Sequence, residues 1–128
     1  MKKIYIAGPM RGHKLYNFPA IDAAEARLRR LGYDVINPAA LDRARGINPE
    51  IFPKDWDWSK VPEGFDLKAV ALECLRQVSE CDGVLLLEGW QNSYGAHTEQ
   101  SLAAWLGLPS LIETWSDSWI AKRLGSPI

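Results

Sequence analysis

The chain has 128 residues, of which 47% are hydrophobic and 24% are charged, a balance that predicts a single globular domain over residues 1–128 and excludes a disordered chain. Fifteen Lys and Arg residues against sixteen Asp and Glu residues give a formal charge of -1. A nucleic-acid polymer is therefore not expected as a partner.

Cysteines and targeting signals indicate the compartment. Cys74 and Cys81 are seven residues apart, which is neither a redox nor a zinc spacing. The apolar run after Lys3 is too short for an export signal, and no run approaches the roughly 20 residues of a membrane span. We expect a cytoplasmic protein without membrane partners. His13 and His97 stand alone, so no metal or other cofactor is expected.

The first forty residues alternate between strand and helix patterns. Residues 4–7 form a short apolar run of β-branched and aromatic residues that ends in alanine, which predicts a buried strand. Apolar residues recur at helical spacing over residues 19–31, and Asn17 is placed to cap that helix. Residues 33–37 are strand-like again and end at Pro38. Together they predict a right-handed βαβ unit.

Residues 42–64 interrupt this alternation with glycines, prolines and tryptophans. They predict a long aromatic loop, which is either a lid over a site or an ordered loop whose tryptophans pack on the surface. The alternation then resumes. We expect a helix over 67–81, a strand over 83–87, a helix over 95–106, a strand over 108–112 and a closing helix around 117–124.

The sum is an α/β fold with three layers: a doubly wound, mostly parallel sheet of four or five strands, flavodoxin-like or Rossmann-like in order. In such sheets ligands bind beyond the carboxyl ends of the strands, where the strand order reverses. We therefore expect the loops 8–16 and 88–96 to face each other across a crevice.

The segment from Ser93 to Glu99 opens the fourth predicted helix. Ser93 is placed to cap it, and free N–H groups around Gly95 favour an anion such as a phosphate, although an ordinary N-cap has the same pattern. Glu99 falls on the apolar stripe of this helix, where an unpaired charge is costly. It is expected either beside a crevice, ionised and suited to be a nucleophile, or in a structural pair with Arg11 or His97.

Three motifs carry a family resemblance: Gly8-Pro9-Met10-Arg11-Gly12, Cys81-Asp82 and Gly89-Trp90-x-x-Ser93-x-Gly95-Ala96-x-x-Glu99. Together they resemble the nucleoside 2-deoxyribosyltransferase superfamily, particularly its small phage-type members and the deoxynucleoside 5'-monophosphate N-glycosidases. The resemblance implies that Glu99 attacks the anomeric carbon, that Ser93 holds a 5'-phosphate and that the first loop contacts the substrate. It also implies a homodimer or a larger homo-oligomer.

Cys74 departs from this resemblance, because related enzymes often carry an aspartate at this place. Glu73 is the neighbouring candidate for the missing acid, but it lies about 100° around the helix from Cys74. Asp66 is another candidate, unless it caps the helix.

The leading hypothesis is an N-glycosidase or 2-deoxyribosyltransferase that cleaves or transfers the N-glycosidic bond of a (deoxy)nucleoside or its 5'-monophosphate. Glu99 and Glu73 are the predicted catalytic residues. The predicted substrate-binding residues are Gly8, Pro9, Met10, Arg11, Tyr16, Trp90, Ser93 and Gly95. Trp90 is the preferred residue to stack on the base, with Trp56 and Trp58 as alternatives, and Tyr16 is expected beside the sugar. The alternatives are a catalytically weak or inactive nucleotide-binding protein of the same fold and a phosphoribohydrolase.

Overall fold

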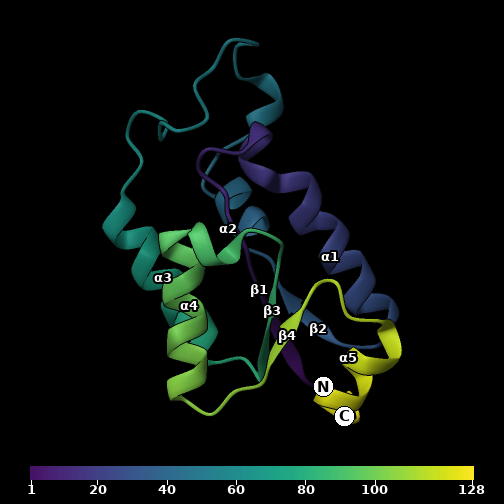
Figure 1. The fold of residues 1–128 in the computed structure, drawn as a ribbon. Helices are drawn as coiled ribbons and strands as arrows, with labels where there is room; N and C mark the ends of the chain where they lie inside the picture. The colour runs from purple at the N-terminus through teal and green to yellow at the C-terminus, as the bar shows by residue number, and fades with distance from the viewer.

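The computed structural model describes residues 1–128 and contains one four-stranded parallel sheet with helices on both faces (Figure 1). Its strands are β1 (Lys3–Ala7), β2 (Asp34–Ile36), β3 (Gly83–Leu86) and β4 (Ser110–Ile112), in the spatial order β2-β1-β3-β4. In the register, Tyr5 of β1 lies opposite Ile36 of β2 and Val84 of β3. The chain thus winds first to one side of β1 and then to the other, which confirms the predicted flavodoxin-like α/β fold.

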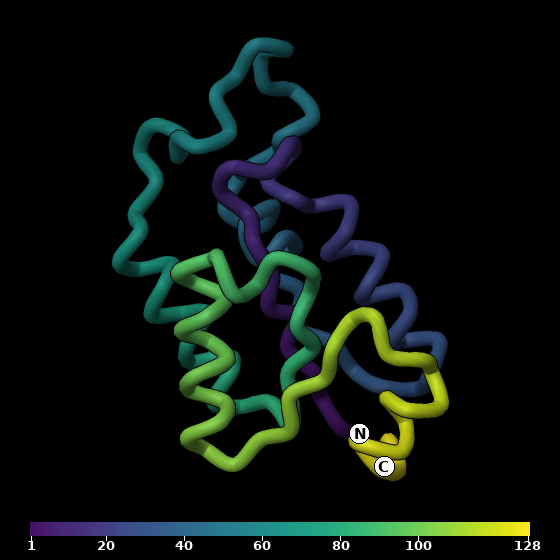
Figure 2. The backbone as a smooth tube through the Cα atoms, viewed as in Figure 1, coloured from purple at the N-terminus to yellow at the C-terminus, as the bar shows by residue number.

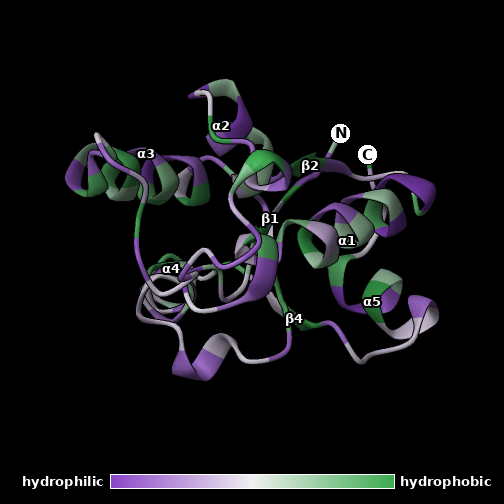
Figure 3. Ribbon diagram, turned by 90° about the horizontal axis from the view of Figure 1, so that it is seen from above, coloured by the Kyte–Doolittle hydropathy of each residue, from purple (hydrophilic) through white to green (hydrophobic).

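Five helices make the outer layers. They are α1 (Phe18–Arg30), α2 (Pro38–Ala44), α3 (Leu67–Ser79), α4 (Tyr94–Trp105) and α5 (Asp117–Leu124). Seen from above, α1 and α5 cover one face of the sheet, while α3 and α4 cover the other (Figure 3). Short 3-10 turns over 14–17, 49–51 and 90–92 lie in the connections.

Two buried clusters hold these layers together, and the strands divide their side chains between them. Ile4 and Ile6 of β1 pack in the larger cluster with α1 and α5, whereas Tyr5 and Ala7 pack in the smaller one with α3 and α4. This alternation follows from the period of two along a strand. Because both faces are covered, β1 is apolar throughout its buried length, as its sequence indicates.

The structure differs from the sequence prediction around α2. The predicted loop 42–64 begins inside this helix, which continues to Ala44. Asn37 caps α2 by accepting a hydrogen bond from the Ala40 N–H at 3.0 Å, and Pro38 takes the first helical position. Asn17 occupies the N-cap position of α1, as predicted, but its side chain makes no capping hydrogen bond. It lies in the left-handed region, and its side-chain amide donates to the Pro9 carbonyl at 2.9 Å.

The segment between α2 and α3 extends past the carboxyl ends of the strands before it returns to the body of the molecule (Figure 2). The two termini lie together at the opposite end, where the Lys2 N–H donates to the Pro127 carbonyl. None of the helices has the length and apolar character that crossing a lipid bilayer requires.

Candidate active site

A cavity of about 780 Å³ is lined by the loops that follow β1 and β3, the two neighbouring strands between which the order reverses. The two loops that the sequence predicts to face each other therefore meet at one cavity. Most of the predicted site residues line it. They are Gly8, Met10, Arg11, Tyr16, Ser93, Gly95 and Glu99.

Glu99 is the central charged group of this cavity. The hydroxyl of Tyr5, which is fully buried on β1, donates a hydrogen bond to Glu99 Oε2. Burial raises the pKa of Glu99 to about 7, and the hydrogen bond from Tyr5 opposes that rise by favouring the ionised form. Burial also holds the pKa of Tyr5 well above 10, so Tyr5 stays a donor at neutral pH. The pair presents an oriented carboxylate that ionises near neutrality.

Cys74 of α3 lies in the same cavity with a second carboxylate, Asp42 of α2. Burial raises the pKa of Cys74 to about 11, and the charges of Glu99 and Asp42 add to the rise. The thiol is therefore neutral and is no substitute for a carboxylate at neutral pH. Asp42 is 9% exposed, pairs with Arg45 at 2.9 Å and has a pKa raised by burial. Glu99 and Asp42 are the only carboxylates in the cavity lining.

The N-terminus of α4 forms another part of the wall. Ser93 caps the helix, since its hydroxyl accepts a hydrogen bond from the Ala96 N–H at 3.2 Å. Arg11 from the first loop lines the same cavity, is exposed and makes no ion pair with an acidic residue. A helix N-terminus and a free guanidinium together favour an anion.

Two glycines that line the cavity, Gly8 and Gly95, differ in the space available for a side chain. A Cβ at Gly8 would lie 2.8 Å from the Leu87 Cβ, so packing just beyond the ends of β1 and β3 excludes a side chain there. A Cβ at Gly95 would meet nothing within 4 Å. The protein's own packing therefore gives no reason for glycine at position 95, although alanine is the better helix former.

Tyr16, in the loop that follows β1, contacts the segment between α2 and α3. Its hydroxyl donates to the Lys60 carbonyl at 2.5 Å and accepts from Trp56 Nε1 at 3.0 Å, while its ring packs edge-on against Trp58. Tyr16 holds this conformation in the left-handed region, with a φ of 50°. Tyr16 is thus part of the cavity wall and holds the first loop against this segment, and its place beside a sugar stays a prediction.

Three predicted site residues lie outside the cavity lining. Glu73 points to an ion pair with Arg76 and a hydrogen bond with Gln77, because the next helical position, Cys74, takes the inward direction. Trp90 packs against the smaller core cluster and stacks on His97, with ring centroids 6.0 Å apart. Pro9 contributes its carbonyl to Asn17.

Asp66 serves as the cap of α3, because its carboxylate accepts a hydrogen bond from the Ala69 N–H at 3.1 Å. Its carboxylate is therefore engaged at the helix terminus, and Asp66 does not line the cavity. No group of three or more His, Cys, Asp or Glu side chains is arranged to hold a metal ion.

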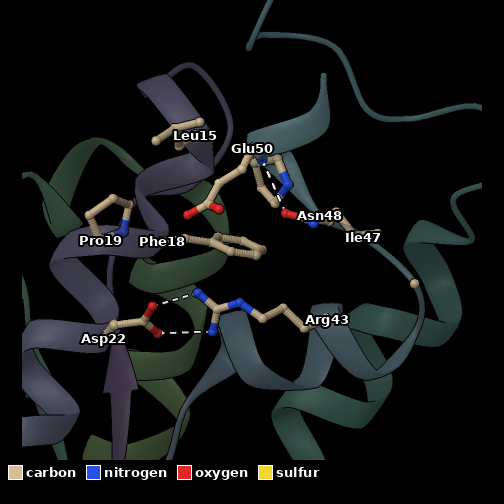
Figure 4. A pocket seen from close by; sticks show the side chains of 10 residues that line it. Leu15, Phe18, Pro19, Asp22, Arg43, Ile47, Asn48 and Glu50 are labelled. Atoms are coloured by element: carbon tan, nitrogen blue, oxygen red, sulfur yellow. Dashed lines mark hydrogen bonds and ion pairs between the residues drawn. The ribbon is translucent and has the colours of Figure 1, made fainter. Parts of the chain in front are cut away.

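A second cavity, of about 550 Å³, lies between α1, α2 and the 3-10 turn that follows (Figure 4). Arg43 makes two hydrogen bonds with Asp22 there, one of them 3.0 Å long, and its guanidinium lies 4.9 Å from the centre of the Phe18 ring. Arg43 and Asp22 are thus paired with each other within the protein.

The sequence did not reveal Tyr5 or Asp42 as site residues. Tyr5 is read only as part of a buried strand, and its contact with Glu99 spans 94 positions. Asp42 was placed at the start of the predicted loop. The Asn37-Pro38 pair, a typical N-cap and first helical residue, was a signal for α2 that places Asp42 on a helix beside the cavity.

Comparisons with known proteins agree with this fold. The solved structure of a 2-deoxyribosyltransferase from the psychrotolerant bacterium Bacillus psychrosaccharolyticus superposes with a TM-score of 0.55 and 21% sequence identity, covering 97% of this chain and 83% of the other. This likeness shows a shared fold. A comparison with curated proteins found no match. Residues 2–112 match a family model described as Domain of unknown function (DUF4406), and the chain therefore belongs to the DUF4406 family.

Proposed function

We propose that this protein cleaves or transfers the N-glycosidic bond of a (deoxy)nucleoside or its 5'-monophosphate, with Glu99 as the nucleophile. The observation that carries the proposal is the Glu99 carboxylate, which Tyr5 orients inside a cavity that also holds an anion-favouring helix terminus. The fold shared with a 2-deoxyribosyltransferase supports the same class of reaction.

The reaction runs through two displacements. The ionised Glu99 oxygen forms a bond to C1' as the bond from C1' to the base nitrogen breaks, and the base leaves with that electron pair and takes up a proton. The resulting glycosyl ester is resolved by water, which gives hydrolysis, or by a second base, which gives transfer. Each displacement inverts C1', so the product retains the original configuration. The Tyr5 hydrogen bond keeps the attacking carboxylate in one orientation.

The wall formed by Ser93, Gly95 and Arg11 is the proposed site of the 5'-phosphate. Backbone N–H groups at the start of α4 and the Arg11 guanidinium supply donors for it. The open space above Gly95 is consistent with this role, because a phosphate that approaches the backbone leaves no room for a side chain.

Replacing Gly95 with alanine tests this assignment. We expect the free energy of unfolding to rise by up to about 1 kcal/mol, since alanine favours the helix. We expect the affinity for a deoxynucleoside monophosphate to fall by about tenfold, as the new methyl group meets the phosphate, while the affinity for the matching nucleoside stays the same. Calorimetric titration measures both affinities. Equal losses for nucleoside and monophosphate would place the phosphate elsewhere.

The activity itself is tested with a panel of deoxyribonucleosides, ribonucleosides and their 5'-monophosphates, with free base followed by chromatography. We expect base release from at least one deoxynucleoside monophosphate, and exchange of the base when a second free base is added if the protein is a transferase. Light scattering on the same sample measures the mass of the homodimer or larger homo-oligomer that we also propose. Binding without base release or exchange would leave a nucleotide-binding protein.

A further inference from the structure

Asp42 is a buried carboxylate for which the proposed reaction has given no role. It sits on α2, whereas Glu99 sits on α4, and the two helices approach the end of β1 from different sides (Figure 3). Both side chains line the same cavity. A carboxylate in a mostly apolar wall is costly unless its oxygens are paired, so its partners matter.

The two oxygens of Asp42 differ in their partners. Oδ1 accepts a hydrogen bond from Arg45 at 2.9 Å. Oδ2 accepts none within the protein, yet no buried side-chain oxygen in the structure is left without a partner. Oδ2 is therefore accessible. Because Asp42 lines the cavity, a ligand in the cavity can contact this atom. Asp42 presents one free acceptor, held in place by an arginine on its other side.

The neighbours of Asp42 suit a flat heterocycle. The segment that follows α2 contributes Ile47, Val61, Pro62 and Phe65 to the lining, which gives this part of the wall an apolar and partly aromatic surface. The proposed phosphate wall lies at the start of α4, and C1' must lie at Glu99. The base of a bound nucleotide then extends toward α2, α3 and this apolar segment.

We propose that Asp42 is a specificity-determining residue, which rests on the proposed function: its free Oδ2 accepts a hydrogen bond from an exocyclic amino group and so selects amino-bearing bases over oxo bases. An ionised carboxylate only accepts hydrogen bonds, so an amino group fits and a carbonyl oxygen is repelled. The Arg45 contact fixes the carboxylate and favours its ionised form. Asp42 acts on the base and not on C1'.

The test compares dAMP with dIMP and dCMP with dUMP. In each pair an oxo group replaces the amino group, and the neighbouring ring nitrogen gains a hydrogen. Their dissociation constants are measured by calorimetric titration on Glu99→Gln protein, in which no base is released. We expect the better amino ligand to bind at least about tenfold tighter than its oxo counterpart. In Asp42→Asn, Glu99→Gln protein the preference reverses, because the new side-chain amide donates to an oxo group.

Asparagine keeps the shape of Asp42, and its carbonyl still accepts from Arg45, so the variant is expected to fold. Asp42→Ser is a second variant that loses the preference without reversing it. Asp22→Asn is the matched control, since Asp22 is also held by an arginine but lines only the second cavity (Figure 4). We expect Asp22→Asn to leave the ratio of amino to oxo dissociation constants unchanged for both ligand pairs.

Two results would overturn the assignment of Asp42. They are an oxo preference in the Glu99→Gln protein, and an amino preference that Asp42→Asn and Asp42→Ser both leave intact. In either case base release by the parent protein still stands as evidence for the proposed function. Failure of all four monophosphates to bind would overturn both the assignment and the nucleotide site.

Discussion

Glutamine in place of Glu99 is expected to remove base release, by about 10³-fold or more, and at the same time to make the protein more stable at alkaline pH. The loss follows because an amide is no nucleophile at C1'. The gain follows because burial raises the pKa of Glu99 from 4.5 to about 7. Above pH 7 the folded protein contains a buried ionised carboxylate, which lowers its stability.

The sign follows from proton binding. Between pH 4.5 and pH 7 the folded state holds more protons on Glu99 than the unfolded state does, so stability falls as the pH rises through this window. Removing the carboxylate should therefore raise the free energy of unfolding by up to about 3 kcal/mol at pH 8, and by little below pH 4.5.

Urea denaturation at both pH values measures this gain, and chromatography of released base measures the loss. Glu80→Gln is the control, because Glu80 is exposed and pairs with Arg76 at 3.3 Å away from the cavity. A Glu99→Gln protein that is still active would remove Glu99 as the nucleophile. Activity loss with reduced stability at pH 8 would point to damage of the fold instead.

Base release is expected to depend on pH with an acid limb set by Glu99. Only the ionised carboxylate attacks, so kcat/KM rises with pH and levels off above a midpoint of about 7. Tyr5→Phe removes the hydrogen bond that favours the ionised form. The pKa of Glu99 then rises, and the midpoint moves to higher pH.

The pH profile of kcat/KM in both proteins checks this expectation. Near pH 6 Tyr5→Phe should lose more activity, relative to the parent protein, than it does at pH 9. At pH 9 Glu99 is ionised in both proteins, and only its orientation differs. Cys74→Ser serves as the comparison, because Cys74 is neutral and also lies close to Tyr5 and Glu99. An equal loss at every pH would mean that Tyr5 acts on structure alone.

The sequence predicted most of the fold because the buried strands and the long helices carry strong local patterns. The closing helix was expected around residues 117–124 and spans Asp117–Leu124. The helix α2 was missed because its seven residues are too few for a clear period, and Pro38 was read as the end of a strand.

The candidate site was predictable only in part, for a physical reason. The placement of Ser93 and Glu99 follows from the start and the period of one helix, which are local properties. The Tyr5 hydroxyl meets Glu99 through the packing of β1 against α4, and Asp42 meets the cavity through the placement of α2. Trp90 packs on His97, and its predicted stacking on a base stays a prediction.

Residues 42–65 form one uninterrupted stretch that supplies Asp42 and the apolar wall, whereas Tyr5 and Glu99 come from elements that this stretch does not include. Tyr16 joins the stretch to the rest of the molecule. On the proposed roles of Asp42 and Glu99, we expect that exchanging this stretch changes which ligands bind and leaves the reacting residues Tyr5 and Glu99 in place. Grafting such a stretch between relatives is a direct route to redesigned selectivity.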